Sequence, residues 1–314
     1  MASLKTRIKS AAPVGLTYWA KTRVQRRRVR RSGVEEALLQ ASPAQERLPL
    51  AELKLLAKEY PSPEVAHWDT KEWIESSTQL GVERVAWMKR VLGARLRTGT
   101  RCLELGAGDA SVAGALANTG AEVLAVDIQR EVYEDARRHM HVPFLEADVS
   151  DLRAVEDDSY DLVYSFDSFE HFPDPAAALS EALRVTRPGG HVYLRFGPLY
   201  DCPDGKHLGD RLGIPYAGVL FEDATIDAHM LEQGRDVINH EYCNYWPLDR
   251  YRALFAPDPQ RFDVVFAYDH LDLSALELIS RYPEVFRARA ESIDSFLVNV
   301  IEILLRKPDA SPQP

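Results

Sequence analysis

The sequence has few cysteines and no long apolar run, and each absence narrows the class of protein. Its three cysteines, Cys102, Cys202 and Cys243, lie far apart and lack the paired spacing of a zinc site. No apolar stretch approaches the roughly 20 residues that a membrane-spanning helix needs. The basic start does not lead into an apolar signal core either. These absences predict a cytoplasmic protein with reduced thiols. No metal ligands are assigned, and metal dependence stays open because a divalent metal could be bound by Asp201, His207, His229, His240 and Glu241, which lack an ordered ligand spacing.

Negative charge is missing from the beginning of the chain and abundant in the rest. Residues 1–34 contain ten Lys and Arg and no acidic residue, although the whole chain has a formal net charge of −10. The remainder therefore has 28 basic and 48 acidic residues, a formal charge of −20. An acidic body argues against a nucleic-acid groove across it, so no nucleic-acid partner is expected.

The basic residues concentrate in one short segment. Seven of them fall between Lys21 and Arg31. Charge runs are usually solvated, so we interpret this segment as a poorly ordered arm. Contact with an anionic surface (phospholipid, nucleic acid or a phosphorylated substrate) is the functional alternative. A transit peptide is a third interpretation if the source is eukaryotic. The sequence leaves these three open, and it also leaves the oligomeric state open.

The order of predicted elements indicates an α/β fold. A long amphipathic helix is expected over 71–92, with residues such as Leu80 and Arg84 packing on a sheet. Five short apolar strands then alternate with helices; the strands are expected at 102–105, 122–127, 142–145, 160–166 and 191–196. The helices between them are expected at 111–118, up to 138 and at 175–185. Such alternation means right-handed crossovers and a doubly wound, mostly parallel sheet.

The remaining segments define the predicted domain limits. Residues 1–70 are interpreted as the basic arm followed by a helical extension or linker, with short helices at 34–41 and 50–59. One domain is expected over 71–306. A lid insertion at about 198–247, rich in Gly, Pro and aromatic residues, follows the fifth strand. A helix at 248–255, a strand at 262–268, a helix at 274–292 and a strand at 296–306 complete the domain, and 307–314 is expected to be disordered.

A glycine turn follows the first strand and predicts a nucleotide-sized crevice. Gly106 and Gly108 allow a tight turn without a Cβ between the backbone and a ligand. A dinucleotide fingerprint would have Gly or Ala at the third position, where this chain has Ser111, and an apolar residue at Glu104. No Gly-Lys-Ser/Thr follows, which excludes a phosphate-cradling loop.

Acidic residues recur where three successive strands end. Glu104 lies at the mouth of the first strand, Asp127 ends the second, and Asp148 follows the third. Carboxyl ends of parallel strands form one row above the crevice. There Asp127 can accept hydrogen bonds from two ribose hydroxyls, Asp148 from an adenine amino group, and Glu104 from an ammonium group. An acidic pocket suits a sulfonium ligand better than a polyphosphate. For Asp148 the alternative is a helix N-cap.

These residues occur within a larger set of motifs that resembles one enzyme family. Together they look like class I S-adenosylmethionine-dependent methyltransferases of the small-molecule group, over roughly Leu80 to Phe196; the motifs are Glu104-Leu-Gly-Ala-Gly-Asp-Ala110, Asp127, Ala147-Asp148-Val149, the run from Tyr160 to His171 and Arg187-Pro-Gly-Gly190. The resemblance implies a Rossmann-like, seven-stranded sheet and S-adenosyl-L-methionine as cofactor. Ala110 replaces the third glycine that the family often has.

The resemblance also implies which residues bind the cofactor and where an acceptor lies. Cofactor contacts are expected from Glu104, Gly106, Ala107, Gly108, Asp127, Ile128, Asp148, Val149, Phe166 and Asp167. An acceptor hydroxyl needs a base with a pKa near neutrality, which favours histidine. His171, after the fourth strand, and His207, after the fifth, are the candidates. The alternative interpretation of His171 is that it shapes the pocket and takes no part in proton transfer.

The predicted function is methyl transfer to a small molecule, at a hydroxyl of a sugar, glycan or secondary metabolite. Within the same class, the alternative is methylation of a lipid or protein at a membrane surface, with the basic arm docking there. From a different class comes a non-catalytic partner subunit that binds S-adenosylmethionine without turnover. Intact acidic residues at all three strand ends favour a working pocket.

Overall fold

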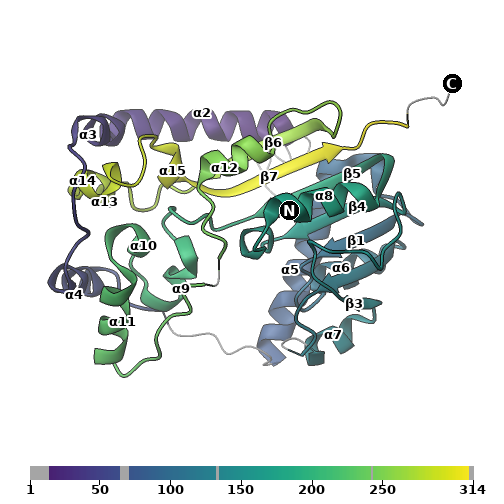
Figure 1. The fold of residues 1–314 in the computed structure, drawn as a ribbon, viewed down its shortest axis with the longest axis horizontal. Helices are drawn as coiled ribbons and strands as arrows, with labels where there is room; N and C mark the ends of the chain where they lie inside the picture. The colour runs from purple at the N-terminus through teal and green to yellow at the C-terminus, as the bar shows by residue number, and fades with distance from the viewer. Residues whose placement is uncertain (1–13, 64–70, 132–133, 242, 311–314) are drawn as a thin grey trace, which may run out of the picture. The chain divides into compact units, whose positions relative to one another are not determined.

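The computed structural model describes residues 14–63, 71–131, 134–241 and 243–310 (Figure 1). The chain divides into two compact units. Unit 1 comprises Met1–Val65, Pro198–Tyr251 and Tyr268–Val300. Unit 2 comprises Ala66–Gly197, Arg252–Ala267 and Ile301–Pro314. The first 13 residues of the predicted basic arm and residues 311–314 of the predicted tail lie outside the described residues.

A seven-stranded sheet, with the order β3-β2-β1-β4-β5-β7-β6, organises unit 2. β1 pairs in parallel with β2 and β4, and so do β2 with β3 and β4 with β5, whereas β7 runs antiparallel to β5. The strands are β1 Arg101–Leu105, β2 Glu122–Asp127, β3 Phe144–Glu146, β4 Tyr160–Phe166, β5 Thr186–Phe196, β6 Asp263–Leu271 and β7 Val298–Arg306. The predicted doubly wound, mostly parallel sheet is confirmed.

β1 lies inside this sheet, between β2 and β4. All of its residues after Arg101 are buried, as expected for a parallel strand covered on both faces. Cys102 lies opposite Val123 on one side and Leu162 on the other. Burial raises the pKa of the Cys102 thiol to about 12, so this cysteine stays protonated and unreactive.

The helices of unit 2 pack against this sheet and against one another. Four of them are α5 Lys71–Leu92, α6 Ser111–Ala117, α7 Glu134–Met140 and α8 Pro175–Val185. α5 approaches α6 so closely that a Cβ on Gly81 would lie 2.4 Å from the carbonyl oxygen of Ser111. On α5, Val85 and Met88 are buried, but Leu80 is 43% exposed. The prediction that Leu80 packs on the sheet is therefore wrong, because the buried stripe runs along the neighbouring face.

A buried glutamate joins α5 to the sheet. Glu302 on β7 is fully buried, and its Oε1 accepts hydrogen bonds from Trp87 Nε1 and Tyr193 Oη, both 2.7 Å long. Buried carboxylates are tolerated only with such partners. The indole, phenol and carboxylate therefore fix the position of α5 against β5 and β7.

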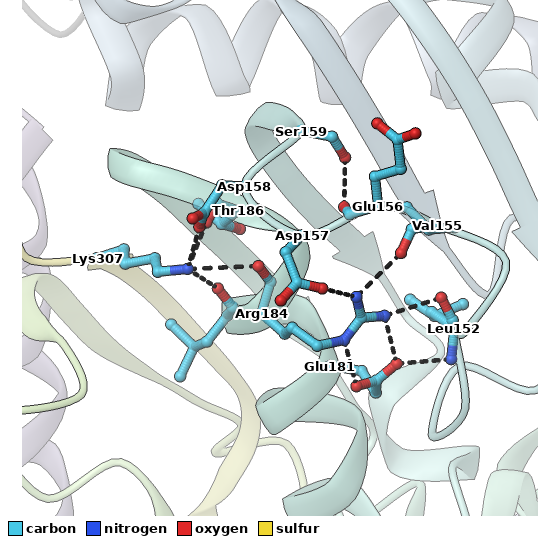
Figure 2. A network of polar contacts seen from close by, with 11 residues as sticks. Leu152, Val155, Glu156, Asp157, Asp158, Ser159, Glu181, Arg184, Thr186 and Lys307 are labelled. Atoms are coloured by element: carbon cyan, nitrogen blue, oxygen red, sulfur yellow. Dashed lines mark hydrogen bonds and ion pairs between the residues drawn. The ribbon is translucent and has the colours of Figure 1, made fainter. Parts of the chain in front are cut away.

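Two cations hold the amino end of β4 and the end of α8 together (Figure 2). Arg184 donates to both carboxylate oxygens of Glu181, to Asp157 and to the carbonyl oxygens of Leu152 and Val155, over 2.5–2.9 Å. Lys307 donates to Asp158 at 2.6 Å and to the last carbonyl groups of α8. Lys307, which the sequence analysis placed at the start of a disordered tail, is thus held in place.

Helices and loops make up most of unit 1. They are α2 Val14–Ser32, α3 Val34–Gln40, α4 Leu50–Glu59, η3 Gly205–His207, α9 Gly209–Leu212, α10 Ala217–Leu220, α11 Asp223–Glu232, α13 Leu276–Arg281, α14 Pro283–Arg287 and α15 Asp294–Leu297. α12 Leu248–Leu254 begins in this unit. α3 packs against α13 and α14, and α4 against α11. The single helix expected over 274–292 is broken at Pro283, whose missing N–H and fixed φ start a new helix.

The basic segment is a regular helix. Residues 14–32 form α2, which lies along the end of β6 (Figure 1). The rings of Tyr18 and Tyr268 stack with centroids 3.6 Å apart, and Gln25 donates to the carbonyl oxygen of Leu271. The interpretation of this segment as a poorly ordered arm is therefore wrong for residues 14–32. Stacking and hydrogen bonds to β6 supply the order that charge alone would not.

None of the helices in the described part of the chain has the length and apolarity needed to cross a membrane.

Candidate functional site

The turn after β1 has the backbone conformation that its glycines permit. Gly106 and Gly108 adopt φ values of 67° and 52°, in the left-handed region that favours glycine. A Cβ on Gly106 would lie 2.6 Å from Cβ of Ser168. Ser168 Oγ also donates to the carbonyl oxygen of Gly106 at 2.8 Å. The turn is thus closely packed on one side by the loop after β4, which requires glycine at position 106.

Ala110 continues this turn and is itself left-handed, with a φ of 58° at the N-cap of α6. For a residue with a Cβ this conformation costs roughly 1–2 kcal/mol. The structure therefore explains why a glycine is frequent at this position in the family that the sequence resembles. Alanine at this position therefore strains the backbone of the turn.

Asp127, at the end of β2, accepts a hydrogen bond from the backbone of the glycine turn. Its Oδ2 accepts a hydrogen bond from the amide of Gly108 and its Oδ1 from the amide of Gln129, both 2.8 Å long. Arg137 on α7 donates to the carbonyl oxygens of the same two residues, at 2.8 and 3.1 Å. Each carboxylate oxygen has a second lone pair, so Asp127 retains the capacity to accept from a ligand.

The residues that follow β2 and β3 differ in their surroundings. Ile128 is 64% exposed although it is apolar, whereas Val149 is buried. Asp148 is exposed, and its Oδ1 accepts from the amide and the hydroxyl of Ser150 at 2.8 and 2.7 Å. The segment after Asp148 forms a turn and no helix, so the alternative of a helix N-cap is wrong.

Glu104 is the most deeply buried of the three acidic residues at the strand ends, Glu104, Asp127 and Asp148. Its side chain is buried within β1, and Tyr164 Oη donates to its Oε2 at 3.3 Å. Burial, together with the nearby charge of Asp109, raises the pKa of the Glu104 carboxyl to about 8. Near neutral pH this group is mostly protonated, and a cation beside it would favour its ionised form.

Two arginines converge on the end of β4. Asp167 adopts a φ of 46° and forms ion pairs with Arg84 of α5 and Arg195 of β5. The guanidinium of Arg84 also lies 5.3 Å from the centre of the buried Phe166 ring. Sequence reasoning missed both arginines. Arg84 stands at helical spacing with apolar residues and was therefore expected to pack on the sheet.

The loop after β4 places a histidine beside a buried acid. In η2, Phe169–His171, the Nε2 of His171 lies 3.8 Å from Oε1 of Glu170, and the His171 ring is half-buried. Burial, followed by the charge of Asp167, raises the pKa of Glu170 well above its usual range. Burial therefore favours the protonated, uncharged form of this carboxyl. The sequence analysis missed its role, and its only signal was its place next to His171.

His207 lies in unit 1, and so in a different unit from the strand ends described above. It occupies η3 with a φ of 55°, and burial lowers its pKa to about 4. Its imidazole is consequently neutral near pH 7. His240, also of unit 1, pairs with Asp227 at 2.9 Å and with Asp223 at 3.4 Å.

Residues 103–194, which contain the glycine turn, Asp127 and His171, match the family model described as a methyltransferase domain. The chain therefore carries a methyltransferase domain over these residues. It is of the kind that uses S-adenosyl-L-methionine. The resemblance inferred from the sequence motifs, and the cofactor that it implied, are confirmed for this domain.

Curated relatives of the methyltransferase domain share one name. A ubiquinone biosynthesis O-methyltransferase from Alkalilimnicola ehrlichii is 29% identical over 165 residues, which are 51% of this chain and 65% of the relative. Another protein of that name, from Acinetobacter baylyi, is 27% identical over 52% of this chain and 68% of its own length. The match thus spans about two thirds of these relatives.

Among solved structures, a putative S-adenosylmethionine-dependent methyltransferase from Listeria monocytogenes covers 74% of this chain and 100% of its own, with 16% identity and a TM-score of 0.47. A putative methyltransferase from Bacillus halodurans covers 72% of this chain and 99% of its own, with 16% identity and a TM-score of 0.46.

Proposed function

We propose that the whole chain is an enzyme that transfers a methyl group from S-adenosyl-L-methionine to a hydroxyl oxygen of a small molecule. The observation that carries the proposal is the arrangement of two carboxylates around the glycine turn. β1 and β2 are in parallel register, with Leu105 opposite Val126, so Glu104 and Asp127 flank Gly106 and Gly108. Neighbouring strand ends with such side chains are where open α/β sheets bind ligands.

The residues at these strand ends fit the cofactor. The turn at Gly106 and Gly108 would leave room for the ligand, and Asp127 would accept from the ribose hydroxyls. The exposed, apolar Ile128 suits one face of an adenine ring, and Asp148 its amino group. Glu104 would accept from the ammonium group of the methionine portion. The bound cofactor supplies an electrophilic methyl group on a positively charged sulfur.

His171 is the residue that we propose as the base. It would accept the proton of the acceptor hydroxyl while the new O–C bond forms and the old S–C bond breaks. Glu170 Oε1 lies 3.8 Å from its Nε2, where an ionised carboxylate would stabilise the imidazolium and make His171 a stronger base; burial, which raises the pKa of Glu170, weakens that support. His207 stays the second candidate, but burial lowers its pKa to about 4, which makes it a weaker base than a histidine with a pKa near neutrality.

The names of the relatives bear on the acceptor. They are O-methyltransferases of ubiquinone biosynthesis, which supports oxygen as the atom methylated and gives no support to a sugar. We therefore propose a hydroxyl acceptor. The acceptor classes to be compared are sugar, aromatic and lipid-linked hydroxyls. A cytoplasmic location also stays a prediction, based on the separate, reduced cysteines.

The test is turnover with methyl-labelled S-adenosyl-L-methionine across these acceptor classes. Labelled product from one class, lost in His171→Ala while cofactor affinity is retained, supports the proposal. Tight binding of S-adenosyl-L-methionine without product from any class would favour the alternative of a non-catalytic binding subunit.

A further inference from the structure

The helix α2 has one face held by unit 1 and another that carries only cations and exposed apolar groups. Tyr18, Thr22 and Gln25 contact β6, and Val29 is buried. Arg26, on the same side, forms an ion pair with Asp294 through both of its terminal nitrogens. These contacts fix the rotation of the helix about its axis, and therefore which side chains point away from its docked face.

The side chains away from the docked face are cationic and lack counter-charges. The exposed basic residues are Lys21, Arg23, Arg27, Arg28, Arg30 and Arg31. Within the part of the chain that the structure describes, none of these six pairs with a carboxylate. Arg23, Arg27 and Arg31 repeat at a spacing of four residues, so they form one stripe along the helix. Charges four residues apart on one helix lie close to the Debye length at physiological salt, about 8 Å, so this stripe acts as one charged surface.

Two exposed apolar residues flank the stripe of Arg23, Arg27 and Arg31, one on each side of it. Trp19 is 60% exposed and Val24 is 67% exposed, which is unusual for an indole and a valine on a helix with another apolar face already buried. The guanidinium of Arg23 lies 5.2 Å from the centre of the Trp19 ring. An amphipathic ring next to cations is the combination that enters the head-group region of a membrane.

We propose that this outward face of α2 docks the protein on a phospholipid surface that carries anionic head groups. The six cations supply attraction to the head groups, and Trp19 and Val24 supply apolar contact at the level of the interface. The remainder of the chain, with a formal charge of −20, is repelled by the same surface, so contact is restricted to this helix. A duplex nucleic acid, with its bases paired and stacked, would gain little from contact with either exposed apolar residue, and for that reason a lipid surface is the better fit.

The proposal is tested by co-sedimentation of the full chain with vesicles. One set contains equal parts of phosphatidylcholine and phosphatidylglycerol, and the other pure phosphatidylcholine. Binding is expected to the first set only, and to weaken as salt is raised. Each cation at an anionic surface contributes about fivefold, so the triple variant Arg27→Gln, Arg30→Gln, Arg31→Gln is expected to bind about 100-fold more weakly.

The matched control removes the same number of exposed charges elsewhere. Lys58→Gln, Lys89→Gln, Arg97→Gln lies outside α2 and is expected to bind nearly as well as the wild type. Equal thermal unfolding midpoints for both triple variants show that the fold is intact. Trp19→Phe is expected to remove a blue shift of tryptophan emission that anionic vesicles induce in the wild type.

Three results would overturn the proposal. They are equal loss of binding in the two triple variants, equal binding of the wild type to neutral vesicles, and displacement of the protein from anionic vesicles by a duplex nucleic acid that binds α2 more tightly. None of these measurements requires methyl transfer, so they stand apart from the outcome of the proposed function.

Discussion

The carboxylate of Asp127 accepts a hydrogen bond of 2.8 Å from the amide of Gly108, and Arg137 donates one of 2.8 Å to the carbonyl oxygen of the same glycine. Both polar groups of one turn residue are therefore held by charged side chains from β2 and α7. A turn fixed in this way needs little reordering when a ligand binds, which lowers the entropic cost of binding.

Arg137→Met is expected to weaken binding of the demethylated cofactor about 30-fold. The variant loses two charge-assisted hydrogen bonds that position the turn. If their loss costs about 2 kcal/mol of binding free energy, the affinity falls about 30-fold. Calorimetric titration measures the effect, and the turnover rate at saturating cofactor should change far less. Arg138→Met removes the exposed neighbour, which pairs with Glu134, and serves as the control. Wild-type affinity in Arg137→Met would show that the turn is held without this residue.

Gly106→Ala is expected to lower the free energy of unfolding by about 2–3 kcal/mol and to abolish cofactor binding. The new Cβ would meet Ser168 at 2.6 Å and would also impose a left-handed backbone on alanine. Gly99→Ala is the matched control, because Gly99 has a φ of 77° but an added methyl group there would have nothing within 4 Å. It should lose about 1 kcal/mol and keep its affinity. Equal effects of the two substitutions on binding would contradict this account.

The affinity for S-adenosyl-L-methionine is expected to rise with pH and level off above about pH 8. The Glu104 carboxyl has a pKa of about 8 in the free protein, and the cationic ligand favours its ionised form. Below that pH, binding must first remove a proton, so affinity falls as the pH falls. Glu104→Gln should bind weakly and lose this component of the pH dependence. Parallel titrations of the two proteins from pH 6 to pH 9 compare them. An unchanged profile in Glu104→Gln would exclude Glu104 as its source.

Glu104 also makes a prediction about stability in the absence of ligand. Its pKa is higher in the folded protein than in the unfolded chain, so its contribution to stability is present at low pH and is lost as the pH rises through about 8. Glu104→Gln should therefore be more stable than the wild type at pH 9, and this advantage should shrink toward pH 6. Urea unfolding at both pH values measures it. A larger advantage at the lower pH would contradict the assigned sign.

Arg184→Met is expected to cost about 3 kcal/mol of unfolding free energy without changing cofactor affinity. The substitution leaves Glu181 without its partner and frees the carbonyl oxygens of Leu152 and Val155 (Figure 2). Arg153→Met removes an exposed pair with Asp151 and is expected to leave the free energy of unfolding nearly unchanged. Denaturant unfolding measures both. A similar cost for the two would show that the Arg184 network contributes little.

Local sequence patterns were sufficient for the central sheet. The bounds predicted for β2, β4, α5 and α8 agree with the structure, because each is a short apolar strand or an amphipathic helix with clear breakers at its ends. β5 begins at Thr186, before the predicted strand. Thr186 pairs with Tyr160, the register then shifts across Arg187-Pro-Gly-Gly190, and pairing resumes with His191 opposite Leu162. Pro283 was a visible breaker that the prediction of one helix over 274–292 passed over.

The candidate site was predicted at its acidic residues and missed at its basic ones. Asp127 and Glu104 follow strands, a position that a linear pattern shows directly. Arg84 and Arg137 lie on helices, and only the folded chain brings them to Asp167 and Gly108. The order of α2 depends in the same way on stacking between Tyr18 and Tyr268, which are distant in sequence. Such long-range contacts leave no periodic signal.

The central claim is that the strand ends around Gly106 and Gly108 bind the nucleoside of S-adenosyl-L-methionine. Its most direct test is calorimetric titration of Asp127→Ala and of Asp158→Ala with the demethylated cofactor. Asp158 is an exposed aspartate at the amino end of β4 and should bind like the wild type when replaced. Asp127→Ala is predicted to lose at least about 30-fold in affinity, because both ligand contacts and the hydrogen bond to Gly108 disappear. Unchanged affinity in Asp127→Ala would contradict the account.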